Sequence, residues 1–315
     1  MNIRVRLKRI SVLVEVYKVC LQYKWKLLSR VDKRIPANSL YKKVFHKKIN
    51  WRSPVDIIEK IAWMEIYADT SLWSLCADKY RMRKYVEEHG FGDCLPELYG
   101  CWNSAGDIDF SGLPKSFVLK TNNGCGTVVV VKDKLKVDED MLRKKMQKWL
   151  KRPYGYAGGQ YHYLRIPPCI IAEELLENDT IGMSYSPNSL IDYKVFCVSG
   201  EPQWFLVVSN RTENHTDLAC YDLDWKSHPE YLVESSHWSK SSCVLPRPVN
   251  FDEMLHICRE ISVDFAQVRI DFYEVRGRLY IGELTFSTGY GGFTLERYSY
   301  LGKKMNIEPI LARGF

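Results

Sequence analysis

The spacing of apolar residues along the chain changes from helical to alternating and back. Between residues 55 and 89, positions such as Ile57, Ile58 and Ile61 recur at helical spacing, which predicts helices. Amphipathic stretches at 138–150 and 251–264 predict two more. Short apolar runs predict strands at 117–119, 128–131, 170–172, 193–198 and 204–208. We therefore expect an α+β fold whose sheets meet at a cleft.

The clearest pattern is a pair of alternating runs, 268–273 and 279–286, on either side of a short charged segment that contains glycine. The segment 274–278 predicts a hairpin turn, which brings Asp271 and Glu283 close together across two strands. Neighbouring carboxylates repel each other unless a cation lies between them. Hard oxygen ligands without histidine or cysteine favour Mg²⁺. The alternative is two surface acids on an ordinary hairpin.

Composition indicates a globular protein. The chain has 315 residues, of which 46% are hydrophobic, enough for two or three subdomains. No uncharged apolar run reaches the length of a membrane span, and the basic start lacks a signal-peptide pattern. Ten cysteines occur without a Cys-x-x-Cys pair, so we expect reduced thiols and a cytoplasmic location.

Positive charge is concentrated at the N-terminus. Residues 1–50 hold 14 Lys and Arg against 2 Asp and Glu, a net charge of +12, whereas the remainder holds 31 against 36, a net of −5. Such a basic amphipathic arm can bind an anionic membrane surface. The alternative is a solvated helix packed on its own body. Nucleic acid is not an expected partner, because the body lacks a basic stripe with interleaved aromatic residues.

A second candidate for chemistry is the segment from Lys120 to Thr127, which contains Gly124 and Gly126 between two predicted strands. A lysine at a strand end that faces a glycine loop can hold phosphate oxygens under a flap of backbone amides. A plain Asn-Gly turn is the alternative reading. The segment does not fit the P-loop or the dinucleotide-binding fingerprint.

The order of these motifs resembles that of ATP-grasp enzymes, in which two α+β subdomains grip ATP. More narrowly, it resembles the TupA-like ATP-grasp family, named for teichuronopeptide biosynthesis. The stretches that carry the resemblance are 56–63, 77–80, 117–124, 170–174, 192–197, 221–225 and 282–286.

The resemblance implies an ATP-grasp fold preceded by a helical basic segment. The expected divisions are a basic arm at 1–50, a helical region at 51–115, a small subdomain with the glycine flap at 116–175, and a large subdomain with the Mg²⁺-binding hairpin at 176–315.

It also implies roles for individual residues. The implied ATP-binding residues are Lys79, Lys120, Asn123, Gly124, Gly126, Glu173, Glu174, Leu176 and Asp192, where Glu173 faces the adenine amino group and Asp192 the ribose. The implied catalytic residues are Lys194, Arg211 and Arg269, near the transferring charge. The implied metal-binding residues are Asp271, Glu283 and Thr285.

The chain departs from the family pattern on the acceptor side. Thr285 stands where D-alanine–D-alanine ligases have an asparagine, which leaves open whether one or two Mg²⁺ ions bind. The tail after the hairpin and the 160–163 segment also differ. The expected acceptor-binding residues there are Tyr161, Tyr163, Ser287 and Thr288, with ordinary loop packing as the alternative for the tyrosines.

The function that the resemblance implies is an ATP-dependent carboxylate–amine ligase that forms an amide through an acyl phosphate. The expected partners are a uronic acid of a bacterial surface polysaccharide, an amino acid or amine, and a lipid-linked glycan at the inner face of the plasma membrane. The alternatives are an ATP-grasp kinase that phosphorylates a hydroxyl and a non-catalytic ATP- or glycan-binding module.

Overall fold

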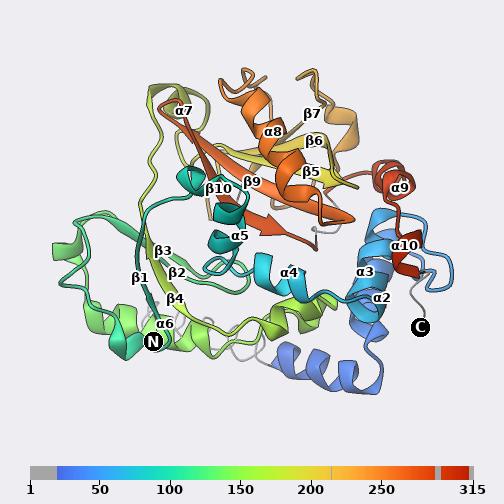
Figure 1. The fold of residues 1–315 in the computed structure, drawn as a ribbon, viewed down its shortest axis with the longest axis horizontal. Coiled ribbons are helices and arrows are strands. Elements are labelled where there is room, and N and C mark those ends of the chain that lie inside the picture. Colours follow the sequence, from blue (N-terminus) through green and yellow to red (C-terminus); the bar gives the residue numbers. More distant parts are fainter. Residues whose placement is uncertain (1–19, 214, 288–291, 312–315) are drawn as a thin grey trace, which may run out of the picture.

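In a computed structural model that describes residues 20–213, 215–287 and 292–311, the strands form two sheets. The small sheet has the strand order β1-β4-β2-β3 and the large sheet the order β10-β9-β5-β6-β7-β8. Helix α6 runs along the small sheet and α8 along the large one (Figure 1). These two α+β units confirm the predicted fold class.

The elements have the following bounds. The small sheet contains β1 (Leu98–Trp102), β2 (Phe117–Thr121), β3 (Val128–Val131) and β4 (Ile170–Glu173). The large sheet contains β5 (Asp192–Val198), β6 (Glu201–Ser209), β7 (Asp217–Tyr221), β8 (Ser239–Lys240), β9 (Gln267–Val275) and β10 (Arg278–Thr285). The helices are residues 20–31, α2 (Arg34–Phe45), α3 (Ile57–Tyr67), α4 (Ser71–Cys76), α5 (Met82–Glu88), α6 (Glu139–Leu150), α7 (Thr180–Tyr185), α8 (Phe251–Ser262), α9 (Leu295–Lys304) and α10 (Glu308–Leu311).

The small sheet is held by an amphipathic helix. Asp138 caps α6 by accepting a hydrogen bond from the Met141 amide at 2.9 Å. Leu142, Met146 and Leu150 recur at every fourth position and are buried. They share a core with Phe117 and Leu119 of β2, and the helix itself was predicted at 138–150. Strand β1 was not predicted, because its residues are all half-buried and show no alternation.

The large sheet buries both faces of its central strand. Every residue of β5 is buried, and α8 covers one face, where Phe205 stacks on Phe251 with ring centroids 5.0 Å apart. The amphipathic pattern at 251–264 therefore predicted α8 correctly, to within two residues at its end.

The C-terminal hairpin has the predicted pairing but a tighter turn. Val275 pairs with Arg278, and the two residues between them, Arg276 and Gly277, both have positive φ, as in a two-residue hairpin turn. A bulge at Gly282 then inserts one residue into β10.

The bulge sets the position of the second acid. Ile281 pairs with Phe272, so regular pairing would place Gly282 opposite Asp271; the inserted residue puts Glu283 there instead. A Cβ atom at Gly282 would lie 2.7 Å from the Tyr273 ring, so glycine fits this crowded bulge. The predicted approach of Asp271 and Glu283 is thus confirmed.

The helices after residue 51 pack against the C-terminal part of the chain. Asp56 caps α3 and accepts a hydrogen bond from the Tyr41 hydroxyl at 2.6 Å. At Gly302 of α9 a Cβ atom would lie 2.2 Å from the Val55 carbonyl oxygen, so the two segments approach too closely for a side chain. Lys60 donates to the carbonyl oxygens of Gly302 and Met305, each at 2.6 Å. One core therefore joins these helices to the large sheet.

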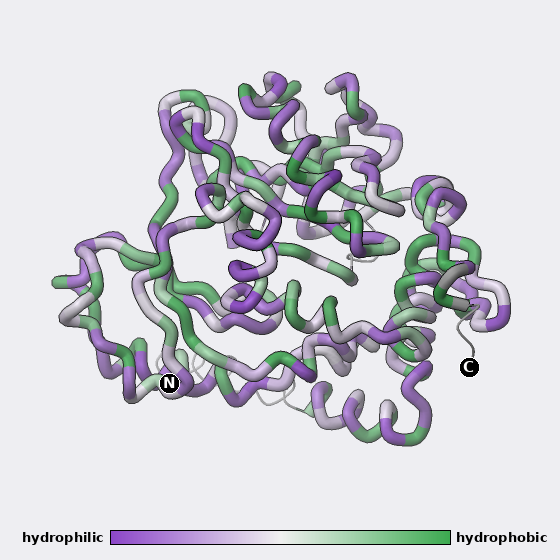
Figure 2. The backbone as a smooth tube through the Cα atoms, in the orientation of Figure 1, coloured by the Kyte–Doolittle hydropathy of each residue, from purple (hydrophilic) through white to green (hydrophobic). Residues whose placement is uncertain are grey.

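The basic N-terminal segment divides into two parts. Residues 1–19 of the predicted arm lie outside the described residues, whereas α2 buries Pro36, Ala37 and Tyr41 against the body. The helix at 20–31 carries both hydrophobic and hydrophilic positions (Figure 2). Within the described ranges, no helix combines the length and apolar character needed to cross a bilayer.

Candidate active site

The two sheets enclose a cavity of about 620 Å³, a size suited to a small-molecule ligand. The small sheet contributes residues such as Val118 and Lys120, and the large sheet contributes residues such as Asp192 and Asp271. The predicted site residues that line it are Lys79, Lys120, Gly124, Gly126, Glu173, Glu174, Leu176, Asp192, Lys194, Arg211, Arg269, Asp271 and Glu283. Residues more than 200 positions apart in the chain therefore meet in one place.

The large-sheet wall is a row of opposite charges set by strand register. Lys194 of β5 pairs with Asp271 of β9, which pairs with Glu283 of β10. The Lys194 ammonium forms an ion pair with Asp271 and lies 2.7 Å from Asp192 Oδ2. Because directly opposed residues share a face of the sheet, the row points into the cavity as a unit.

Arg269 joins the two predicted metal-binding acids. Its Nε donates to Asp271 Oδ1 at 2.6 Å, and its Nη2 donates to Glu283 Oε1 at 3.3 Å and to the Thr285 hydroxyl at 3.0 Å. Burial lowers the pKa of Arg269, but the carboxylates of Asp271 and Glu283 raise it further, so the guanidinium stays protonated.

Glu283 is held in its ionised form. Burial raises the pKa of its carboxyl, but the positive charges of Lys79, Arg269 and Lys194 lower it well below the ordinary value. The Thr285 hydroxyl donates to Glu283 Oε1 at 2.7 Å. Thr285, which stands where D-alanine–D-alanine ligases have an asparagine, therefore orients the Glu283 carboxylate.

The residues fit a magnesium ion in their donor chemistry. Carboxylate oxygens from Asp271 and Glu283 lie on neighbouring strands, and Mg²⁺ commonly takes one or two protein carboxylates together with substrate phosphates. Within the described part of the chain, no group of three or more His, Cys, Asp or Glu side chains could hold a metal. Asp271 and Glu283 are the two residues that would hold such an ion.

The small-sheet wall carries a single tight ion pair. Lys120 Nζ lies 2.5 Å from Glu173 Oε2, and Arg83 Nη1 lies 3.7 Å from the same carboxylate. Sequence reasoning missed Arg83, which lies on α5 outside the recognised motifs. Glu173 is nearly inaccessible, at 4% exposed, and its carboxylate is engaged with these cations. Its implied contact with adenine remains a prediction.

The glycine flap crosses the cavity between β2 and β3. Gly124 and Gly126 have φ of 79° and 73°, backbone conformations that other residues rarely adopt. The Thr121 hydroxyl donates to the Thr127 hydroxyl at 2.7 Å and closes the base of the loop. Asn123, predicted to be part of the flap, lies in this loop but does not line the cavity.

Asn122 anchors the stem of the flap, although sequence reasoning assigned it no role. It is fully buried, its Oδ1 accepts from the Cys169 amide at 2.7 Å, and its Nδ2 donates to the Pro167 carbonyl at 3.0 Å. Its own carbonyl accepts from the Lys79 amide at 3.0 Å. The sequence gives no signal for this role, since Asn-Asn-Gly is also typical of a plain turn.

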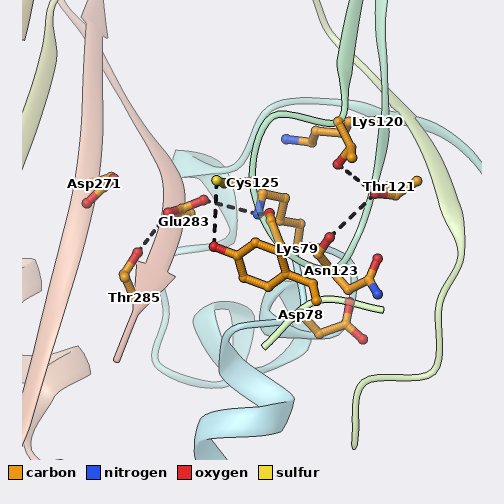
Figure 3. Close-up of polar contacts among 12 residues, drawn as sticks. Asp78, Lys79, Lys120, Thr121, Asn123, Cys125, Asp271, Glu283 and Thr285 are labelled. Atoms are coloured by element: carbon orange, nitrogen blue, oxygen red, sulfur yellow. Dashed lines mark hydrogen bonds and ion pairs between the residues drawn. The ribbon is translucent and has the colours of Figure 1, made fainter. Parts of the chain in front are cut away.

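Lys79 connects the flap to the hairpin. Its Nζ donates to the Gly124 carbonyl at 2.8 Å and lies 3.1 Å from Glu283 Oε2. Figure 3 shows Lys79 between the flap and Glu283. The Tyr154 hydroxyl donates to Cys125 Sγ at 3.6 Å. The ring of Tyr154 supports the flap, because a Cβ at Gly124 would lie only 2.5 Å from it.

The cavity offers an unsatisfied acceptor at Asp192, the residue predicted to face the ribose. Asp192 Oδ1 is buried without a hydrogen-bond partner among the described residues. Burial raises the pKa of Asp192, and Lys194 opposes that shift. A ribose hydroxyl could supply the missing donor. The amide of Glu174, another predicted ATP-binding residue, donates to the Glu97 carbonyl at 2.9 Å, so this amide is already engaged within the protein.

Three of the predicted acceptor-binding residues, Tyr161, Tyr163 and Ser287, do not line the cavity. The Tyr161 hydroxyl donates to the Lys33 carbonyl at 2.6 Å, and Tyr163 is buried with its ring edge-on to Tyr154. This geometry favours ordinary packing for both tyrosines. The Ser287 hydroxyl is buried without a partner among the described residues, and Thr288 lies outside them.

Two α+β units that enclose a charged cavity under a glycine flap define an ATP-grasp protein. The chain belongs to the TupA-like ATPgrasp family, whose profile matches residues 59–305. This match confirms the family resemblance that the sequence motifs indicated. A comparison with curated proteins gave no match.

Among solved structures, the chain is similar to a D-alanine–D-alanine ligase from Bacillus anthracis, with 15% identity over 76% of this chain and 70% of that one and a TM-score of 0.45. It is similar to the ATP-grasp ligase PsnB, with 11% identity over 76% and 61% of the two chains and a TM-score of 0.40. For an L-amino acid ligase from Bacillus licheniformis, identity is 14% over 70% and 44%, with a TM-score of 0.41. The chain therefore spans less than two thirds of the last two proteins.

Proposed function

We propose that the protein is an ATP-dependent carboxylate–amine ligase that makes an amide through an acyl phosphate. The observation that carries the proposal is the row Lys194–Asp271–Glu283 with Arg269 on one wall of the cavity, opposite Lys120 and the flap on the other. Two acids among several fixed cations suit the transfer of a phosphoryl group.

The protein's own groups have separable tasks in this reaction. A substrate carboxylate attacks the terminal phosphorus of ATP, the bond to the bridging oxygen breaks, and ADP leaves. Lys120, Arg269 and Lys194 would stabilise the charge that spreads over the phosphoryl oxygens. Mg²⁺ held by Asp271 and Glu283 would neutralise phosphate charge when bound. An amine then displaces phosphate from the acyl carbon and loses a proton.

The flap would keep water away from the acyl phosphate. Lys79 and Tyr154 contact the flap at Gly124, and the backbone amides of the flap would bind the phosphates. The mechanism requires no side-chain nucleophile. Cys125, although exposed in the flap, has no role in it.

The proposed substrates are a uronic acid carboxylate of a surface polysaccharide and an amino acid or amine. The test measures ADP release across a panel of uronic acids crossed with amino acids, followed by mass spectrometry of the product. Release that needs both partners and gives an amide supports the proposal. Hydroxylamine should trap the acyl phosphate as a hydroxamate. A product that keeps the phosphate on a hydroxyl would replace the ligase with a kinase.

If ATP binds but no member of the panel causes ADP release, the protein is a binding module and the proposal fails. Glu253→Gln, an exposed change on α8 behind the large sheet, is the matched control for charge changes in the cavity.

We also propose that the helix at 20–31 holds the protein at an anionic membrane surface. Tyr23, Leu27 and Val31 are 62%, 60% and 80% exposed and recur at every fourth position. Lys24 and Arg30, both exposed, lie beside this stripe. An apolar stripe with a basic border is typical of helices that lie in the plane of a membrane.

Vesicle co-sedimentation tests the membrane proposal. Binding to vesicles with anionic lipid should fall sharply for Leu27→Glu and stay unchanged for Leu135→Glu, a control at a position 88% exposed on the body. Equal binding of both variants, or no preference for anionic over zwitterionic vesicles, would contradict it.

A further inference from the structure

A smaller cavity lies beside the flap, where the helix at 20–31 meets the end of α6 and the loop at 153–166. Its volume is about 240 Å³, which suits a ligand the size of one sugar phosphate. Asn123 of the flap, which does not line the active-site cavity, lines this one. We call this cavity the basic pocket and define it by six of its lining residues, Lys26, Asn123, Lys151, Arg152, Tyr154 and Tyr156.

The pocket concentrates positive charge. Lys26 comes from the helix at 20–31, whereas Lys151 and Arg152 directly follow α6. Among the described residues that line the pocket, none is acidic, and no ion pair in that part of the chain joins these three cations to a carboxylate. A concave surface with charges of one sign attracts a ligand of the opposite sign. The pocket therefore favours an anion, and Lys and Arg bind phosphate oxygens well.

The two tyrosines of the pocket differ in what covers them. The Tyr154 ring lies against Gly124 and stands edge-on to Tyr163, with ring centroids 4.9 Å apart. Tyr156 is half-buried, and within the described ranges no other ring or cation stacks on it. One aromatic face therefore remains for the C–H surface of a sugar, next to the cations.

The pocket connects two parts of the protein that already have proposed tasks. Lys26 precedes Leu27, which belongs to the exposed stripe that we propose lies on the membrane. Asn123 belongs to the flap, and Tyr154 contacts it at Gly124. A phosphate that joins a glycan to its lipid lies at the level of the lipid headgroups, where a helix in the plane of the membrane also lies. Such a phosphate would therefore arrive next to Lys26.

We propose that the basic pocket binds the phosphate-bearing sugar of a lipid-linked acceptor glycan, with the phosphate on Lys26, Lys151 and Arg152 and the sugar ring on Tyr156. The inference rests on the proposed ligase function and deepens it, because it gives the acceptor a second point of attachment outside the active-site cavity. An anionic lipid headgroup carries the same phosphate without the sugar, so the test must separate these two sources.

Ligand-observed NMR tests the proposal without turnover. The full-length protein is first saturated with Mg²⁺ and a non-hydrolysable ATP analogue, so that phosphate probes do not enter the active-site cavity. The probes are glucose 1-phosphate, glycerol 3-phosphate as the headgroup, and uncharged glucose. Glucose 1-phosphate should bind more tightly than glycerol 3-phosphate, and glucose should not bind. Equal binding of the two phosphates, or no binding of glucose 1-phosphate, would overturn the proposal.

The main variant is Lys151→Gln/Arg152→Gln, which changes two exposed side chains. Loss of their charge-assisted hydrogen bonds should weaken glucose 1-phosphate binding about tenfold or more. Lys144→Gln is the matched control, because Lys144 is exposed on α6 and lines neither cavity. Tyr156→Ala should reduce the affinity for glucose 1-phosphate to that for glycerol 3-phosphate. Unchanged binding in the double variant would overturn the assignment of the pocket.

The outcomes separate this inference from the ligase proposal. If glucose 1-phosphate binding depends on Lys151 and Arg152 but no uronic acid supports ADP release, the pocket stands and the ligase assignment falls. If ADP release occurs, a uronic acid oligosaccharide with a 1-phosphate should have a lower KM than the same oligosaccharide without it. The double variant should erase that difference and leave the KM for ATP unchanged. A difference that survives in the double variant would overturn the pocket and leave the ligase.

Discussion

The two walls of the cavity are built in different ways. On the large sheet, Lys194, Asp271 and Glu283 come from three adjacent strands, and their spacing follows from register. On the small sheet, Lys120 has one close acidic partner, Glu173, and the remaining groups belong to a loop with two glycines of positive φ. A sheet fixes charges in place, whereas a glycine loop can open and close. The large-sheet wall therefore suits the proposed phosphoryl transfer, and the small-sheet wall suits the exclusion of water.

The largest loss of activity should follow from removing a charge on the large-sheet wall. Asp271→Asn leaves Lys194 and Arg269 without their shared acid and removes a proposed magnesium ligand. We expect ADP release to fall about a thousandfold, the upper range for loss of a fixed electrostatic group. Glu253→Gln should keep wild-type activity. Turnover of Asp271→Asn near the control's rate would disprove the metal assignment.

A smaller loss of activity is expected from a change on the small-sheet wall. Lys120→Met removes a cation that we propose binds phosphate, and it leaves Glu173 with Arg83 alone. The loss in kcat/KM should be about a hundredfold, because other cations remain around the phosphates. Steady-state kinetics with varied ATP will measure it. A loss equal to that of Asp271→Asn would mean that the two walls do not differ as proposed.

The flap itself can be tested with two matched glycine variants. Gly124→Ala and Gly126→Ala both place a Cβ at positive φ, but only the first meets a neighbour, the Tyr154 ring at 2.5 Å. The clash should make Gly124→Ala about tenfold worse in kcat/KM than Gly126→Ala, equivalent to about 1.4 kcal/mol. Adding Tyr154→Leu should recover most of the difference. Equal kinetics of the two single variants would show that the flap does not rest on Tyr154.

The charges on the large-sheet wall should also make the stability of the fold depend on pH. Cations lower the pKa of Glu283 below its ordinary value despite burial. An acid with a depressed folded-state pKa stabilises the fold above its unfolded pKa and loses that contribution as pH falls toward the folded value. Denaturant melts from about pH 7 to about pH 3 should therefore show a steeper loss for the wild type than for Glu283→Gln. Parallel curves would argue against the network.

The smallest effect tests the acceptor side. Tyr161→Phe removes the hydrogen bond to the Lys33 carbonyl and should cost about 1 kcal/mol of unfolding free energy. The KM for the uronic acid should not change, because the hydroxyl does not line the cavity. An increase in that KM would restore Tyr161 as an acceptor-binding residue.

Sequence patterns predicted the parts of the site that depend on local periodicity. The alternation at 268–273 and 279–286 predicted the hairpin and the pairing of Asp271 with Glu283, and the family motifs predicted which side chains line the cavity. The bulge at Gly282 was missed, because a single glycine in a strand does not show whether the partner strand gains or skips a residue.

What the sequence did not predict depends on contacts between distant segments. The role of Asn122 comes from backbone groups near residues 167–169, and β1 is a strand because β4 lies beside it. Tyr161 and Tyr163 were predicted to bind the acceptor, with loop packing as the alternative, and the Tyr161 hydroxyl donates to the Lys33 carbonyl just before α2. Such contacts follow from the tertiary fold, which no local pattern encodes.

The position of Lys79 has a consequence for how the protein responds to its ligands. The Lys79 ammonium contacts both the Gly124 carbonyl of the flap and the Glu283 carboxylate of the hairpin. One cation therefore links the position of the flap to the charge on the hairpin. A magnesium ion that takes Glu283 would compete for the contact that holds the flap. By thermodynamic reciprocity, opening the flap must then change magnesium affinity by the same factor. Lys79→Met should abolish this coupling, so that flap mobility in hydrogen exchange no longer depends on magnesium.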